Sequence, residues 1–513
     1  MNAYCASKSD SARAAIFALL LAAVSLVLHL RFVEYADDDA YIHMRVARNF
    51  WLHGEPYFNL GERVMASTSP LWIILTSPFA ALGDAQPIAV AVLNALVLVG
   101  AAITWSAVYE KLFQSRRSWE RAVATLVVFF TLAPASMGLM ESSLAMLLVG
   151  LGFLGALRGS WWGMPAAITA IFVRPECAVF CVSALAIKCM RRAVCSRSEV
   201  ITGLAIFISL ALFQIFQFGT LYPHTARVKE LVYQLNGEEF VRALLVAGYG
   251  EWMAKSMLPW VACVVVVLMA WMILQSKGVT RNGLRILSAL LSSIFVVFVA
   301  PAALIIAVYA VKRVLVFPWY APLFLVPLHL VFLGFFMAGG LSRRLLAGVL
   351  LLPLIFTSLA ALAVIVRPAC AVSFDAGARA RHLRHVGLEL AQEFPSAVMM
   401  APEIGALGFE FKGKIVDAVG LASPEALKFH PLKVPEQRPT SAHGGVPAAL
   451  VVYVRPKLVV GLEGFMLDFL KSNESAAYDI RRTSPVDSDD LIFIPNGRVF
   501  GSNALIIAVR RDS

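Results

Sequence analysis

Long apolar runs alternate with short polar segments through the first two thirds of the chain. A helix needs about 20 apolar residues to span a bilayer, and fewer when it is packed inside a bundle. Eleven runs approach or exceed this length, at 14–33, 86–109, 121–138, 142–157, 161–173, 176–187, 200–218, 257–275, 287–311, 314–336 and 345–366. The pattern therefore predicts an α-helical polytopic membrane domain over residues 1–366, with about 11 transmembrane helices.

Basic residues fall between these runs in an order that predicts the orientation. They cluster at 8–13, 111–121, 188–197, 277–285 and 343–344. Short basic loops stay in the cytoplasm, and eleven spans with a cytoplasmic N-terminus place all five clusters there. The first run has no small-x-small cleavage site after it, so we interpret it as an uncleaved anchor rather than a signal peptide.

A further apolar stretch, residues 70–83, has only 14 residues and two prolines, and counting it as a span would place Arg116, Arg117 and Arg121 outside. We expect a re-entrant or interfacial helix on the outer side. The outward-facing segments are then 34–85, 139–141, 174–175, 219–256, 312–313 and everything from 367 onward. The two long loops, 34–85 and 219–256, are the ones expected to carry function.

The tail from Arg367 onward loses the apolar runs and has the composition of a soluble domain. A helix is predicted near 376–393, and Asn496-Gly497 is a hairpin-turn signal. Short apolar strands are predicted at 397–401, 414–417, 448–454, 490–495 and 504–510. We therefore expect a small α/β or α+β domain over residues 367–513 on the outer face.

Composition agrees with this division. The chain is 59% hydrophobic and 15% charged, whereas an ordinary globular protein is about a quarter charged. This balance excludes a soluble enzyme, a disordered scaffold and a collagen-like fibre. The net charge of +11 resides mainly in the short basic loops, so we expect no nucleic-acid partner. The seven cysteines have no paired spacing, and neither a disulfide framework nor a zinc site is predicted.

Candidate chemistry begins just outside the first span, where three aspartates at 37–39 open a predicted helix. Ile42, Val46 and Phe50 recur on one face of this helix, and Gly54 ends it. Aspartates commonly cap helices, so capping is one interpretation. Three in a row exceed what a cap needs, and neighbouring like charges raise one another's pKa, which suits a base that takes a proton from a sugar hydroxyl. The residues alone leave both interpretations open.

The same loop carries the strings DDAYIHMRVARN, GEPYFNLGERV and STSPLW. It resembles the first outer loop of the GT-C membrane glycosyltransferases, in particular the branch that includes the mycobacterial terminal arabinofuranosyltransferases. His43 and Val46 depart from that branch, where Ser or Thr and Tyr are usual. The matching residues, in order, are Asp38, Asp39, Ala40, Tyr41, Ile42, Arg45, Asn49, Gly61, Glu62, Val64, Ser69, Pro70, Leu71 and Trp72.

Four further segments resemble the same branch, each in a predicted outward-facing region. They are Met140-Glu141-Ser142, Arg174-Pro175-Glu176, Tyr222-Pro223-His224-Thr225 followed by Lys229, and residues 401–427 of the tail. His224 replaces a usual Asn. Five similar segments in the correct order make the resemblance fairly specific.

The resemblance implies an integral glycosyltransferase of the bacterial cytoplasmic membrane that works on the periplasmic face. It would transfer a sugar, such as the pentofuranose arabinose, from a polyprenyl phosphate to a cell-envelope glycan, lipid or protein acceptor. A single direct displacement would invert the anomeric carbon. No cofactor is implied. No cluster of carboxylates and histidines has metal-ligand spacing, so no protein-held catalytic metal is predicted, although a divalent ion shared by Asp38, Asp39 and the donor phosphate stays open.

The resemblance also implies residue roles. Asp38 would be the general base and Asp39 would orient the base or the acceptor. The donor phosphate would be bound by Lys229, Arg174 and His224. The substrate would be positioned by Tyr41, Arg45, Glu141 and Glu176.

Structural interpretations of these residues, and other functions of the chain, stay open. Lys229 could simply reach lipid head groups, and Arg174 and Glu176 could form a structural ion pair. The whole chain could instead be a transporter or flippase of lipid-linked sugars, or a non-catalytic envelope protein that binds such lipids through its tail. The long acidic outer loop, the one-sided tail and the lack of a visible inverted repeat weigh against transport.

Overall fold

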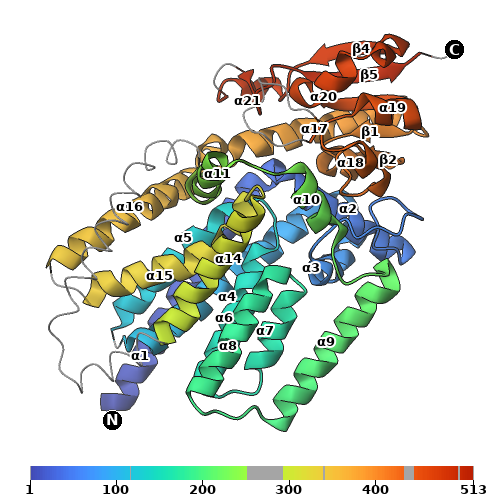
Figure 1. Ribbon diagram of the computed structural model, residues 1–513. Helices are drawn as coiled ribbons and strands as arrows, with labels where there is room; N and C mark the ends of the chain where they lie inside the picture. Colours follow the sequence, from blue (N-terminus) through green and yellow to red (C-terminus); the bar gives the residue numbers. More distant parts are fainter. Residues whose placement is uncertain are drawn as a thin grey trace.

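The computed structural model describes residues 2–115, 117–250, 293–338, 341–432, 444–494 and 497–511. Over these residues the chain is mostly helical, with one small sheet near the C-terminus. Figure 1 shows a bundle of helices that carries the sheet-containing domain at one end, whereas the N-terminus lies at the other end.

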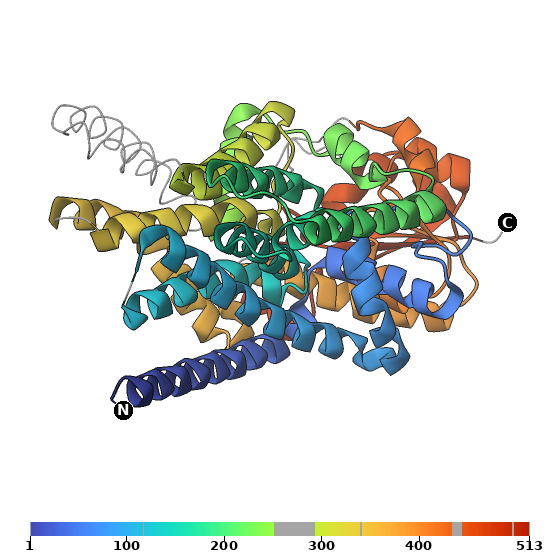
Figure 2. The same cartoon turned by 90° about the horizontal axis from the view of Figure 1, so that it is seen from below.

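The bundle is built around α4 (Gln86–Phe113), which packs against α1 (Asn2–Phe32), α5 (Ser118–Met137) and α6 (Ser142–Arg158). Seen from below in Figure 2, α1 runs along one edge of this bundle. The other helices of the bundle are α7 (Gly163–Ile171), α8 (Ala178–Met190), α9 (Arg197–Phe218), α14 (Ala300–Lys312), α15 (Pro322–Ala338) and α16 (Leu341–Ala363).

Five helical segments among the described residues are long and apolar enough to cross a membrane. They are Ala12–Tyr35, Pro70–Phe113, Ser118–Met137, Arg197–Phe218 and Phe295–Lys312. Shorter apolar helices cover Ser142–Arg158, Pro322–Met337 and Leu351–Ala363. The helical, apolar character expected of a membrane protein is thus present.

The count of eleven spans stays a prediction. The predicted span 257–275 lies outside the described residues. The predicted spans 161–173 and 176–187 contain α7 and α8, with 9 and 13 residues. At 1.5 Å per residue these helices are only about 14 and about 20 Å long, less than the hydrocarbon core of about 30 Å. Neither forms a full-length crossing helix by itself.

Residues 70–85 form α3 (Pro70–Thr76) and the 3-10 helix η2 (Ser77–Ala85). Gly83 has φ 58° and ψ −123°, which breaks the helical path before α4 begins. Although residues 70–113 form one apolar segment by composition, the backbone turns at Gly83. The short separate helix expected here is present, and its depth in a membrane stays a prediction.

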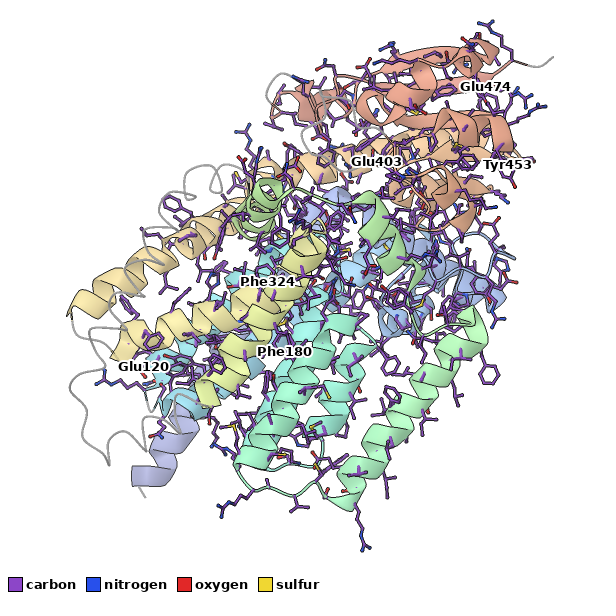
Figure 3. The ribbon with its side chains drawn as sticks, in the orientation of Figure 1. Glu120, Phe180, Phe324, Glu403, Tyr453 and Glu474 are labelled. Carbon is purple, nitrogen blue, oxygen red and sulfur yellow. The ribbon has the colours of Figure 1, made fainter. Side chains whose placement is uncertain are left out.

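Polar segments gather at the end of the bundle that carries the C-terminal domain. There α2 (Asp38–His53), α10 (His224–Val232) and α11 (Gly237–Tyr249) lie between the long helices and that domain (Figure 1). Glu120, which belongs to the predicted cytoplasmic cluster 111–121, lies at the opposite end, while Glu403 and Tyr453 belong to the C-terminal domain (Figure 3). The side of the membrane on which each end lies stays a prediction.

The C-terminal domain is a five-stranded sheet with helices on both faces. Strand order is β2-β1-β3-β5-β4, parallel over the first three strands and antiparallel at β5 and β4. One face is covered by α17 (Phe374–Glu393) and α18 (Gly405–Glu410), the other by α19 (Ala448–Val454) and α20 (Glu463–Leu470). The strands are β1 (Met399–Ala401), β2 (Ile415–Asp417), β3 (Leu458–Leu462), β4 (Tyr478–Thr483) and β5 (Leu505–Arg510).

Two predicted strands of this domain are wrong. Residues 448–454 form α19, because the parallel pairing of β1 with β2 and β3 requires crossover connections. Its valines favour strands, yet Leu450 and Val451 are buried while Tyr453 is 65% exposed, so one face packs. Residues 488–491 form the short helix α21 (Ser488–Leu491) where a strand was expected, and β3 and β4 were not predicted. Asn496 of the expected turn lies outside the described residues.

Candidate active site

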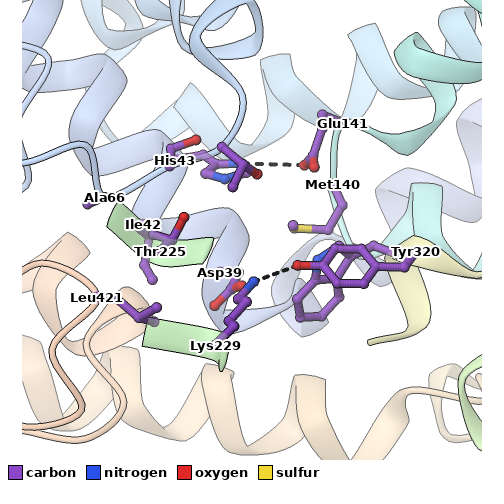
Figure 4. A pocket seen from close by; sticks show the side chains of 13 residues that line it. Asp39, Ile42, His43, Ala66, Met140, Glu141, Thr225, Lys229, Tyr320 and Leu421 are labelled. Atoms are coloured by element: carbon purple, nitrogen blue, oxygen red, sulfur yellow. Dashed lines mark hydrogen bonds and ion pairs between the residues drawn. The ribbon is translucent and has the colours of Figure 1, made fainter. Parts of the chain in front are cut away.

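A small polar cavity lies where the loops at this end of the bundle meet the C-terminal domain. Its free volume is about 20 Å³, which suffices for about one water-sized group. Figure 4 shows the side chains that surround it. The lining comes from six segments far apart in sequence: Asp39, Ile42, His43, Ala66, Ser67, Thr68, Met140, Glu141, Thr225, Lys229, Trp319, Tyr320 and Leu421.

Asp39 and Lys229 face this cavity together (Figure 4). Asp39 lies in the first turn of α2, and Lys229 lies on α10 and donates from Nζ to the Tyr320 hydroxyl at 2.6 Å. Burial opposes the charge of Lys229, but Tyr320 and the Asp39 carboxylate outweigh it and raise the pKa of Lys229 above its usual value. The cavity therefore holds a carboxylate beside an amine that stays protonated.

Arg174 lies behind the cavity wall and is only 1% exposed. Its guanidinium binds Glu141 Oε1 at 2.7 Å and Glu176 Oε1 at 3.1 Å, and its Cζ lies 4.1 Å from the centre of the Tyr320 ring. The Tyr309 hydroxyl donates to the same Glu176 oxygen at 2.5 Å. Because two carboxylates already occupy Arg174, the geometry favours a role in holding Glu141 in place over direct phosphate binding.

Asp38 does not line the cavity. Its two carboxylate oxygens accept the backbone N–H groups of Gly405 and Ala406, at 3.0 and 2.8 Å, in the first turn of α18. A side chain at Gly405 would collide with the backbone of Asp38, so the contact requires glycine there. Asp38 thus joins α2 to the C-terminal domain, and the geometry favours Asp39, not Asp38, as the candidate base.

Arg45 and Tyr41, expected to position substrate, also lie in the contact with the C-terminal domain. The Arg45 guanidinium is buried and donates to the carbonyl oxygens of Phe58, Gly408, Phe411 and Gly413. Tyr41 is buried with its ring 5.4 Å from that of Phe409. Neither side chain lines the cavity, so their expected role at the substrate is not supported by the geometry.

His224 joins α10 to the loop after β2, because its Nε2 lies 2.9 Å from the carbonyl oxygen of Gly420. Asp417 holds this loop: its buried carboxylate accepts the N–H groups of Val419 and Ala422 at 2.9 and 2.8 Å. Leu421 from the same loop reaches the cavity. His224 therefore helps the C-terminal domain to close the cavity, and it does not line the cavity as a phosphate ligand.

A larger, mostly apolar groove adjoins the polar cavity. It has a free volume of about 410 Å³, and Thr68, Lys229 and Tyr320 line both spaces. Glu176 also lies at its edge. Apolar lining residues come from α7, α8, α9, α10 and α14 and include Ile171, Val179, Phe207, Ala211, Ala226, Ile305 and Val308.

Several cavity residues were missed from the sequence. His43 lies four residues after Asp39, and that spacing places both on one face of a helix. The sequence could therefore have predicted that His43 lies beside Asp39. Tryptophans near the ends of spans commonly anchor a helix at the membrane interface, so Trp319 did not indicate a site, and neither did Tyr320. Thr225 and Leu421 depend on contacts between α10 and the C-terminal domain, which no local pattern predicts.

Comparison of the chain with protein-family models and with curated proteins finds no match. Among the residues that the structure describes, no three His, Cys, Asp or Glu side chains are grouped so as to hold a metal ion. Both Asp38 oxygens are bound to backbone N–H groups, so Asp39 is the carboxylate of that pair which is placed to contact a ligand in the cavity.

Proposed function

We propose that the chain is a membrane glycosyltransferase of the GT-C kind that takes a sugar from a polyprenyl phosphate. One observation carries the proposal: Asp39 and Lys229 face the same polar cavity, and that cavity meets an apolar groove at Lys229. Transfer of a sugar from a lipid phosphate needs a base for the acceptor hydroxyl, a cation for the phosphate and an apolar site for the lipid chain. The three features adjoin one another in the required order.

In the proposed reaction, an acceptor hydroxyl attacks the anomeric carbon while Asp39 accepts its proton. The bond between the anomeric carbon and the phosphate oxygen breaks, and its electron pair leaves with the polyprenyl phosphate. Lys229 stabilises the negative charge that develops on that oxygen, which is how a preorganised cation lowers such a barrier. Attack opposite to the leaving group gives inversion at the anomeric carbon.

The apolar groove suits the first isoprene units of the donor, because aliphatic and aromatic side chains line most of it. The sugar would then project past Lys229 toward Asp39. We further propose that the sugar is a pentofuranose such as arabinose and that the acceptor belongs to the cell envelope. The protein would have eleven spans and would act at the periplasmic face of a bacterial cytoplasmic membrane. These finer features rest on the resemblance of the outer loops and on the order of the basic clusters.

The direct test is transfer by the purified protein. We would incubate it with radiolabelled decaprenyl- and undecaprenyl-phosphate sugars, arabinofuranose among them, and with envelope fractions as acceptor. We expect label to move to acceptor and free polyprenyl phosphate to appear with one donor, and neither to occur with Asp39→Asn. Movement of the intact labelled lipid across a vesicle bilayer, without cleavage, would instead identify a flippase.

A further inference from the structure

His43 and Glu141 face each other in the polar cavity, where the dashed line in Figure 4 marks their long contact, which is an ion pair only when His43 is protonated. His43 Nδ1 lies 3.7 Å from Glu141 Oε2, and the two side chains are 8% and 1% exposed. Neither atom has a hydrogen-bond partner among the described residues, and the same is true of Thr225 Oγ1 in the cavity lining. Buried polar atoms are costly when unpaired, so this arrangement points to a ligand.

The spacing fits a single bridging oxygen. A separation of 3.7 Å exceeds the usual hydrogen-bond limit of about 3.2 Å, yet one oxygen can lie about 2.8 Å from both atoms. The free volume of about 20 Å³ also admits one group of that size. The gap between these two side chains is therefore matched to one hydroxyl group, and the rest of the sugar would lie outside that gap.

The expected charges of Glu141 and His43 indicate which kind of ligand group fits between them. The other Glu141 oxygen pairs with Arg174 at 2.7 Å, which favours an ionised carboxylate that only accepts hydrogen bonds. Burial lowers the pKa of His43, against the opposing Glu141 and Asp39 carboxylates, so a neutral imidazole with one N–H is expected at neutral pH. An acceptor beside a donor complements a hydroxyl, whereas the carboxylate would repel a phosphate oxygen.

We propose that His43 and Glu141 form a binding subsite for one hydroxyl of the donor's sugar. The sugar hydroxyl donates to Glu141 Oε2 and accepts from His43 Nδ1. A sugar whose phosphate lies at Lys229 can reach this subsite, because Lys229 lines both the groove and the cavity. The assignment rests on the proposed glycosyltransferase function, and it makes His43 a specificity-determining residue at a position where the resembling enzymes have Ser or Thr.

The first experiment measures donor binding without acceptor. The probes are decaprenyl-phosphate arabinofuranose and its 2-, 3- and 5-deoxy analogues, and the proteins are the wild type, His43→Phe and His43→Asn. We expect the wild type to bind one analogue roughly 10- to 100-fold more weakly than the parent, the usual range for a hydrogen bond to a charged group. His43→Phe keeps Glu141 but lacks the neutral imidazole donor, so this discrimination should fall by roughly 2- to 10-fold, and His43→Asn should restore part of it. Equal discrimination by His43→Phe and the wild type, or none by the wild type, would overturn the subsite.

A second measurement does not depend on the donor. In an experimental density map of the ligand-free protein, we expect an ordered water within hydrogen-bond distance of both His43 Nδ1 and Glu141 Oε2. A direct contact between the two side chains, with no water, would overturn the subsite. If the protein binds none of the four lipids, the proposed arabinose donor fails, and the density map still decides whether the subsite exists.

Discussion

Replacing Arg45 by methionine should loosen the contact between α2 and the C-terminal domain while leaving every group of the polar cavity in place. Arg45 donates to four backbone carbonyl oxygens, those of Phe58, Gly408, Phe411 and Gly413. Methionine keeps the apolar stem but donates to none of these oxygens, of which Phe58 O still accepts from Asn49 Nδ2 at 3.1 Å. Three of them belong to the segment 408–413, at the end of α18 and in the loop that follows.

The size of the effect follows from these bonds. A hydrogen bond to a charged group contributes about 1.5–3 kcal/mol, and four of them together exceed that range. Removing a buried charge recovers part of the cost of desolvation, which is large enough at this site to lower the pKa of Arg45 to about 10. We therefore expect a net loss of about 3 kcal/mol, which corresponds to roughly a 100-fold change in an opening equilibrium.

Amide hydrogen exchange in detergent micelles measures that opening. Peptides covering 405–413 should lose protection roughly 100-fold in Arg45→Met, while peptides from β3 and β5 keep theirs. Arg48→Met is the matched control, because Arg48 donates to a single carbonyl of the C-terminal domain, that of Phe409, at 3.1 Å. It should lose about tenfold or less. Unchanged protection in Arg45→Met, combined with lost transfer, would show that Arg45 does not hold the C-terminal domain against α2 and would favour a role in substrate binding.

Three further predictions concern the cavity, the groove and the pH dependence. Lys229→Ala should lower kcat and raise the donor KM together, because the phosphate loses its cation. Lys412 is exposed, and Lys412→Ala should change neither constant. Unchanged donor kinetics in Lys229→Ala would show that Lys229 only contacts lipid head groups. Ala211→Trp should fill the apolar groove and raise the donor KM at least tenfold. The neighbouring Leu212 does not line the groove, so Leu212→Trp should leave the donor KM unchanged. Equal effects of the two substitutions would show that the lipid chain binds elsewhere. Burial, followed by the charge of a neighbouring carboxylate, raises the pKa of Asp37 from 3.8 to about 7, so its contribution to stability is present below pH 4 and is lost as the pH rises through 7. Across that window the free energy of unfolding of the wild type should fall by up to about 4 kcal/mol more than that of Asp37→Asn. The buried Asp38 and Asp417 carboxyl groups, whose pKa values are raised to about 6, titrate in both proteins. Identical pH profiles would contradict the burial argument.

The loops that meet at the cavity were predictable because their positions follow from the alternation of apolar runs. Asp39, Glu141 and Lys229 come from three such loops, and all three side chains line one cavity. Which aspartate faces the cavity was not predictable from the pattern. Consecutive residues of a helix point about 100° apart, so only the docking of α18 onto α2 decides that Asp38 turns away and Asp39 turns in.

The same limit explains the errors in the C-terminal domain. The sequence of α19 contains three valines and a tyrosine, and such residues favour strands when considered locally. Its helical state depends on the parallel pairing of strands that lie far apart in the chain. Likewise, Arg45 has the charge and place of a substrate-binding residue, and only the positions of the Gly408, Phe411 and Gly413 carbonyl groups show that it is already occupied.

If Asp39 is the base in sugar transfer, Asp39→Asn and Asp38→Asn must differ sharply in their effect on the transfer rate. An amide cannot accept the acceptor's proton, so Asp39→Asn should lower the transfer rate by roughly 10²–10⁴-fold while the protein stays folded and still binds donor. Asp38→Asn should keep transfer within about tenfold of the wild type and should instead weaken the protection of Gly405 and Ala406. Transfer that survives Asp39→Asn but is lost in a folded, donor-binding Asp38→Asn would contradict the account.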